Sequence, residues 1–199
     1  MRRLIPITLA ALAIALSGCG YSLRSSKTPS LLSKKGVRRI YVRPMTNGTF
    51  RPGVENIVFN ALVRAINGSP ELRAAPTIEQ ADAELLGNVS RVERNVGGLL
   101  KAADLNPKGL GSPNILVATE YVAVLGCDFT LRTIEGRGVP VEVLWKGGLS
   151  RSKPFPANNQ LWSLGSTSAL INESELERSL GDVAEQMGRD AVQSMLEDF

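Results

Sequence analysis

The stretch from residue 119 to residue 134, TEYVAVLGCDFTLRTI, decides the fold because its apolar side chains recur at every second position. Such alternation places apolar residues on one face of a strand and polar residues on the other. The sequence therefore predicts a half-buried strand of an antiparallel sheet. Cys127 lies on the apolar face, so we expect it to fill the core rather than to act as a reactive thiol. The predicted buried face holds Tyr121, Ala123, Leu125, Cys127, Phe129 and Leu131.

Further strand patterns lie on both sides of this stretch. Residues 37–44 are rich in β-branched side chains and end at a proline, which predicts a strand. Residues 83–94 divide their apolar side chains between two faces and predict another. After a glycine-containing turn at residues 135–138, the segment 139–150 is expected to return as the next strand.

Two helices are predicted from apolar residues spaced three and four apart. Pro52 and Gly53 open the first, whose apolar stripe runs from residue 54 to residue 66. The sequence NGSP at residues 67–70 is expected to end it, with a left-handed glycine cap. The pattern Ser-x-x-Glu at residues 174–177 resembles a capping box and predicts a last helix over residues 175–197.

These elements follow the order β-α-β-β-β-α, which predicts an α+β fold. We expect two helices packed on one face of a mostly antiparallel four-stranded sheet. The segments 95–114 and 152–171 contain several glycines and prolines and are expected to be irregular. The second face of the sheet would then be open, and its side chains are either solvated or part of a binding surface. This face is expected to include Arg39, Tyr41, Arg43, Asp128, Thr130 and Arg132.

The N-terminus resembles the export signal of a bacterial lipoprotein. Two arginines precede an apolar run at residues 4–16, which is shorter than the roughly 20 residues that span a bilayer. The sequence LSGC at residues 16–19 then resembles a lipobox, which implies a diacylglycerol and an N-acyl lipid on Cys19. Gly20 follows in place of the aspartate that favours the inner membrane, which implies an outer-membrane, lipid-anchored protein. The expected domains are a signal peptide at 1–18, a lipidated tether at 19–36 and one folded domain at 37–199.

The composition excludes several classes of enzyme. The chain has no histidine, which excludes Ser-His-Asp and Cys-His chemistry and argues against a zinc or non-haem iron site. The net charge of +4 includes two arginines of the signal peptide, so nucleic acid is not expected as a partner. Four acidic residues that could pair as acid and base are scattered without motif spacing: Asp82, Glu84, Asp128 and Glu142. We expect no enzyme activity, no metal and no cofactor apart from the covalent lipid.

Four segments together resemble the LptE family of lipopolysaccharide-assembly lipoproteins. They are GYSLR at residues 20–24 directly after the lipobox, IYVRP at 40–44, MTNGTFRPGVE at 45–55 and NALVR at 60–64. The motif match covers residues 16–66, and the order of elements extends the resemblance over the rest. Several motif residues are turn or helix formers that could serve only the fold: Asn47, Gly48, Pro52, Gly53 and Glu55.

The resemblance implies a role in binding rather than catalysis. LptE proteins plug the lumen of the LptD β-barrel, help that barrel to assemble and help lipopolysaccharide to reach the cell surface. It therefore implies an LptD-type barrel and lipopolysaccharide as partners, and a place on the periplasmic side or within the barrel lumen. Lipopolysaccharide carries phosphates, which Lys and Arg bind. The candidate contact residues are Arg39, Arg43, Arg132 and Lys146, each of which could instead be a solvated strand residue.

A second reading is a periplasmic interaction module of another type. The opening Ile-x-Val-x-Pro-x-x-Asn at residues 40–47 also resembles lipoproteins that regulate peptidoglycan synthases, and the N-terminal domains of CsgG-like and TolB-like proteins. Those proteins usually continue with alternating strands and helices. The three consecutive strands predicted here favour the LptE family.

Overall fold

The computed structural model describes residues 30–101, 116–135, 140–158 and 167–197. The helices are α2 (Leu31–Lys34), α3 (Val54–Gly68) and α5 (Thr167–Leu196), with a short 3-10 helix at Ile78–Gln80. The strands are β1 (Arg39–Val42), β2 (Thr46–Asn47), β3 (Arg73–Ala74), β4 (Ala83–Lys101), β5 (Leu116–Thr133) and β6 (Val143–Pro156). The predicted α+β class is confirmed.

The six strands form one mixed sheet in the order β3-β1-β4-β5-β6, with β2 also paired to β4. β4, β5 and β6 form an antiparallel meander, whereas β1 is parallel to β4 because the intervening chain, which includes α3, crosses over between them. The predicted four-stranded, mostly antiparallel sheet is therefore only roughly correct. Strands β2 and β3 were not predicted, because two residues are too few to show the alternation of side chains that identifies a strand.

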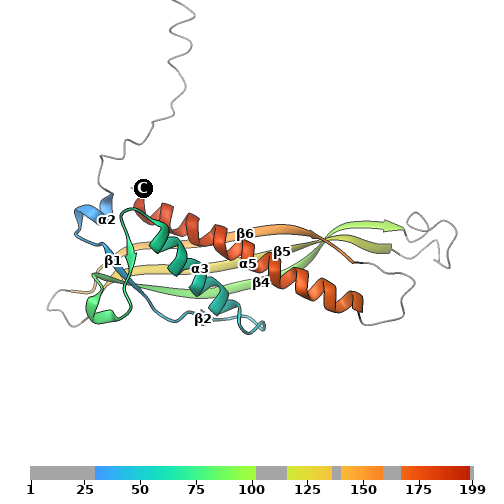
Figure 1. The fold of residues 1–199 in the computed structure, drawn as a ribbon, viewed down its shortest axis with the longest axis horizontal. Coiled ribbons are helices and arrows are strands. Elements are labelled where there is room, and N and C mark those ends of the chain that lie inside the picture. Colours follow the sequence, from blue (N-terminus) through green and yellow to red (C-terminus); the bar gives the residue numbers. More distant parts are fainter. Residues whose placement is uncertain (1–29, 102–115, 136–139, 159–166, 198–199) are drawn as a thin grey trace, which may run out of the picture.

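Both long helices cover the same face of the sheet, as predicted (Figure 1). The alternation of β5 holds, because Leu125, Cys127, Phe129 and Leu131 are all at most 1% exposed beneath the helices. The apolar stripe of α5 also faces inward, and Leu180 and Met187 are fully buried against the strands. The core therefore lies between one layer of helices and one layer of strands.

Several predicted boundaries are wrong. Helix α5 begins at Thr167, so Ser174 lies inside the helix and does not cap it. Gly68 is the last residue of α3 and keeps a helical backbone, since the positive-φ glycines among the described residues are Gly36 and Gly53. Long elements extend through part of what was expected to be irregular chain, because pairing with a neighbouring strand overrides a weak local preference for loops.

The segment 95–114, which was expected to be a loop, is partly a strand of the sheet. Strand β4 continues to Lys101 because β5 pairs with it along its whole length. Residues 102–114 of that expected loop lie outside the described residues. The segment expected to be irregular from Ser152 onward likewise begins with the end of β6, which pairs with β5 up to Pro156.

The molecule is elongated, and its two ends differ (Figure 1). At one end, α2 packs near the end of α5, and Leu32 of α2 is buried in the core. Residues 30–36 therefore belong to the folded domain, although we expected them in the tether. At the other end, the paired strands β4 and β5 extend beyond both helices (Figure 1). No helix among the described residues is long and apolar enough to cross a membrane.

Candidate functional site

The sheet face that points away from the helices is the candidate site, and we call it the open face. Cross-strand pairs place Glu84 opposite Arg132, Asn88 opposite Asp128 and Thr130 opposite Lys146 on this face. Strand β1 adds residues from its own open side, since Tyr41 is paired with Glu84. The expected membership of the open face is therefore confirmed. It comprises Arg39, Tyr41, Arg43, Glu84, Leu86, Asn88, Asp128, Thr130, Arg132 and Lys146.

A buried carboxylate lies at the centre of the open face. Glu84 is 1% exposed, and one of its oxygens accepts a hydrogen bond at 2.7 Å from Nε of Arg132 and lies 2.7 Å from Nη2 of the same guanidinium. Its second oxygen is 3.2 Å from Nη2 of Arg43 and has no partner with hydrogen-bond geometry. One carboxylate between two guanidinium groups leaves a net positive charge, so this cluster attracts anions while its arginines are held in place.

Arg39 lies beside this cluster and has its own acidic partner. Its guanidinium is 3.1 Å from Asp82, and the backbone N–H groups of Arg38 and Arg39 donate to the same carboxylate at 3.0 and 2.8 Å. Partial burial raises the pKa of Asp82, but these N–H groups and the Arg39 charge outweigh it and hold the pKa below its ordinary value. The charge of Arg39 is therefore already neutralised by Asp82.

Lys146 differs from the three arginines. It is exposed on β6, and it forms no ion pair with any carboxylate in the described parts of the chain. A hollow of about 290 Å³ opens on the same face between Arg43, Asn88, Asp128 and Thr130. Of the four candidate residues, Lys146 is thus the one whose charge is free to meet a ligand. Arg43 and Arg132 together carry one positive charge that Glu84 does not neutralise.

The acidic residues considered for catalysis are mostly engaged in ion pairs. Glu84 binds two arginines, Asp82 binds Arg39, and Glu142 accepts from Lys35 at 2.7 Å. Within the described residues, no three side chains of the types that bind metals are gathered at one point. Three of the four acids therefore have a cationic partner in the described chain.

The motif segment at residues 45–55 folds around one asparagine. The side-chain oxygen of Asn47 accepts from the backbone N–H and the hydroxyl of Thr49 at 2.9 and 2.7 Å. Its amide nitrogen donates to the Arg51 carbonyl at 2.8 Å and to Glu55 at 2.6 Å. Backbone N–H groups near Glu55 and the Asn47 amide lower the pKa of Glu55. These hydrogen bonds fix the conformation of the loop. The motif residues therefore serve the fold, which the sequence allowed as one interpretation.

The loop is also attached to α5. The guanidinium of Arg51 forms an ion pair with Glu173 and lies 3.7 Å from Glu177. Glu177 was expected to cap its own helix, and it contacts Arg51 instead. Phe50, at the tip of the loop, is fully exposed. Sequence reasoning missed the arginine contact because its partners are more than a hundred residues away in the chain.

Of the two cysteines, Cys127 lies within the described residues and Cys19 does not. Cys127 is 1% exposed in the core, and burial together with the charge of Asp128 raises the pKa of its thiol to about 12. It is therefore a core residue, as predicted, and a poor nucleophile at neutral pH. Cys19, the expected lipid attachment site, lies outside the described residues.

Comparisons with known proteins give limited similarity. No family model matches this chain, and no curated protein matches it either. Three solved structures resemble it in part of the fold. Protein XCC0632 from Xanthomonas campestris has 12% identity and a TM-score of 0.48, covering 80% of this chain and 84% of its own. Rare lipoprotein B from Shewanella oneidensis has 14% identity and a TM-score of 0.44, covering 79% and 93%. The PelC dodecamer from Paraburkholderia phytofirmans has 16% identity and a TM-score of 0.42, covering 81% and 90%.

Proposed function

We propose that this protein is an outer-membrane lipoprotein that pairs with an LptD-type β-barrel as a plug and assembly factor. In this role it supports assembly of lipopolysaccharide at the cell surface. The lipobox ending at Cys19 and the LptE-like segments up to residue 66 motivate the proposal. The protein acts by binding, with its lipid at one end and its folded domain against the barrel.

The elongated shape is the observation that carries this proposal. Strand β4 has 19 residues, which corresponds to about 60 Å at the usual rise per residue. The hydrocarbon core of a bilayer is only about 30 Å thick. A rod of this length, tethered to a membrane at the α2 end, can reach from the periplasmic rim deep into a barrel.

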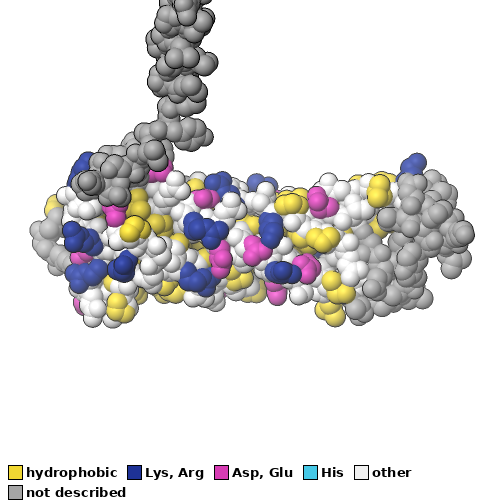
Figure 2. All heavy atoms as spheres, turned by 45° about the horizontal axis from the view of Figure 1, so that its top comes forward, with side chains coloured by type: hydrophobic (Ala, Val, Ile, Leu, Met, Phe, Trp, Pro, Cys, Tyr) yellow, Lys and Arg dark blue, Asp and Glu magenta, His cyan; other side chains and the backbone are white. Residues whose placement is uncertain are grey.

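The surface of the rod suits a water-filled lumen. The interior of large outer-membrane barrels is polar. Charged side chains of both signs alternate along the molecule in Figure 2, and most on the open face are ion-paired. The loop around Asn47 adds a rigid unit, since its hydrogen bonds and the Arg51 contacts fix it to α3 and α5. A plug needs such a fixed shape because it must match a fixed wall.

Lipopolysaccharide contact would use the positive charge of the open face. Lys146 is free of ion pairs within the described residues, and the Arg43–Glu84–Arg132 cluster carries one net charge. A matched pair of variants tests this contact. Lys146→Gln is expected to weaken binding of purified lipopolysaccharide, whereas Lys101→Gln at the far end of β4 removes the same charge and is expected to leave binding unchanged.

Co-purification tests the pairing itself. A C-terminally tagged protein is isolated from outer membranes in mild detergent, and its partners are identified by mass spectrometry. We expect a large outer-membrane barrel of the LptD type in stoichiometric amount. Recovery of a peptidoglycan synthase, or of nothing while the barrel is present in the lysate, would instead favour the periplasmic interaction module.

A further inference from the structure

The end of the molecule at which the chain enters the domain carries two neighbouring hollows. We call it the anchor end, and it consists of α2, the start of β1, β3 and the last turns of α3 and α5. The hydroxyl of Ser30, the first described residue, donates to Glu71 at 2.5 Å and fixes the point of entry. The opposite end is the β4–β5 hairpin. The two hollows of the anchor end differ in chemistry.

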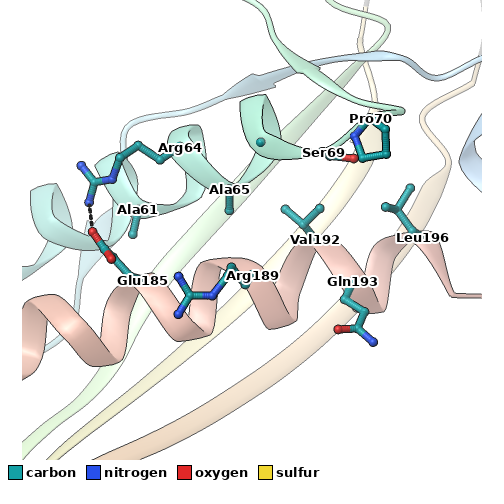
Figure 3. Close-up of a pocket in the computed structure, with 11 residues that line it drawn as sticks. Ala61, Arg64, Ala65, Ser69, Pro70, Glu185, Arg189, Val192, Gln193 and Leu196 are labelled. Atoms are coloured by element: carbon teal, nitrogen blue, oxygen red, sulfur yellow. Dashed lines mark hydrogen bonds and ion pairs between the residues drawn. The ribbon is translucent and has the colours of Figure 1, made fainter.

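The first hollow is an apolar groove between α3 and α5. The helices approach closely at Gly188, where an added Cβ would lie 3.0 Å from the Ala61 carbonyl oxygen. Towards their last turns they diverge and leave a groove of about 510 Å³, shown in Figure 3. Its floor is built from Ala61, Ala65, Val192 and Leu196. A groove of this size lies within the usual range for sites that bind small molecules.

The second hollow is basic and meets the groove at Pro70, which lines both. It measures about 390 Å³ and is lined by Arg38, Arg39 and Arg73 together with Ser33 and Glu71. Arg73 donates to the Ser69 and Leu72 carbonyls at 2.6 and 2.7 Å, which fixes its guanidinium at the end of α3. Figure 2 shows Lys and Arg side chains at this end of the molecule as well as further along it.

Several of these positive charges have no acidic partner. In the described chain, no carboxylate pairs with Lys34, Arg38, Arg73 or Arg189. The carboxylates nearby are occupied, since Asp82 holds Arg39, Glu142 holds Lys35 and Glu185 holds Arg64. Glu71, which accepts from Ser30, is the remaining acid in the basic hollow. The anchor end therefore combines an excess of cations with an apolar groove.

We propose that the anchor end docks onto the surface of an anionic phospholipid bilayer. The unpaired cations meet headgroup phosphates, and the groove between α3 and α5 accepts an acyl chain. This combination fits an amphiphile better than a protein strand or helix, since its two hollows take opposite chemistries side by side. The contact depends on the lipid anchor for proximity and is independent of any pairing with a barrel.

The length of the preceding chain brings the bilayer within reach. Ten residues lie between Cys19 and Ser30, so the chain from one to the other spans at most about 40 Å when it is extended. A lipid on Cys19 therefore keeps the anchor end near the headgroups. Basic residues near an anionic surface add to the hold of a lipid anchor. The added contact fixes which end of the rod lies against the headgroups.

Vesicle binding of the unlipidated chain tests the docking. The Cys19→Ser protein, produced without the signal peptide of residues 1–18, is mixed with vesicles of phosphatidylethanolamine and phosphatidylglycerol, or of phosphatidylcholine alone, and separated by flotation. We expect binding to the anionic vesicles that weakens as salt is added. Arg38→Gln and Arg189→Gln should each lower the partition coefficient about fivefold, whereas Lys101→Gln should not change it. No binding, or equal losses in all three variants, would overturn the proposal.

A fluorophore shows which end faces the bilayer. An environment-sensitive dye is attached to Gln193→Cys at the groove rim or to Lys101→Cys at the hairpin end. The buried Cys127, with its pKa raised to about 12, should stay unlabelled in the folded protein. We expect a blue shift on vesicle addition for the Gln193→Cys label alone. A shift of the Lys101→Cys label, with or without the other, would make the hairpin end a membrane contact and refute the docking.

Discussion

Replacing the buried carboxylate at the centre of the open face should destabilise the protein markedly. In Glu84→Gln the side chain keeps its shape and an acceptor oxygen, but Arg132 and Arg43 both lose the negative charge that lies between them. Removing one partner of a buried ion pair costs about 3–5 kcal/mol. Arg132 and Arg43 keep 27% and 49% of their side-chain surface in water, which lowers the expected cost to about 2–3 kcal/mol.

Thermal and urea unfolding measure this loss. A change of about 2–3 kcal/mol corresponds to a fall in melting temperature of roughly 5–10 °C for a domain of this size. The double variant Glu84→Met, Arg132→Met removes both partners and should lose less stability than Glu84→Gln. A cost below about 0.5 kcal/mol for Glu84→Gln would show that the cluster is solvated and that its burial does not govern stability.

Three further predictions concern the packing and the loop. Gly188→Ala should destabilise the fold by up to about 2 kcal/mol, because the new Cβ meets the backbone of Ala61. Gly181→Ala on the same helix meets open space and should stabilise the fold by about 0.5–1 kcal/mol. Equal effects of the two variants in urea unfolding would contradict the close approach at Gly188. Asn47→Ala should cost about 2 kcal/mol in the same assay and speed proteolytic cleavage of the loop, because four hydrogen bonds are lost; wild-type cleavage rates would argue against this role. Cys127 should resist alkylation when folded. Since its pKa rises from 9.0 to about 12 on folding, its stability contribution is complete below pH 9 and is lost between pH 9 and 12. Stability should therefore fall less over that range in Cys127→Ala than in the parent, and equal falls would contradict the raised pKa.

Local periodicity was enough to predict the two-layer arrangement. The alternation of β5 and the apolar stripe of α5 are repeated over many residues, so each gave the type and the buried face of its element. The open face followed from the same alternation, and its expected residues are those observed. The end of β4 and the start of α5 could not be predicted from local sequence patterns. Pairing with β5 extends β4, and packing on the sheet extends α5, beyond the residues that carry those patterns.

The roles of individual site residues depend on contacts between distant segments. Glu84 was considered only as one of several scattered acids, because its arginine partners lie on β1 and β5. The ion pair of Arg39 with Asp82 and the free charge of Lys146 are equally invisible in the sequence. The basic hollow at the anchor end brings together α2, β1 and β3, so no local motif could indicate it.

Cross-linking inside the cell tests the plug most directly. A photo-reactive amino acid is placed at Lys146 on the open face, or at Gln186 on the exposed side of α5, on opposite sides of the rod. A protein enclosed by a barrel should cross-link to it from both positions. Cross-links to an LptD-type barrel from both residues are the result that the proposed function predicts. Cross-links from one face only, or from both faces to periplasmic proteins other than the barrel, would contradict it.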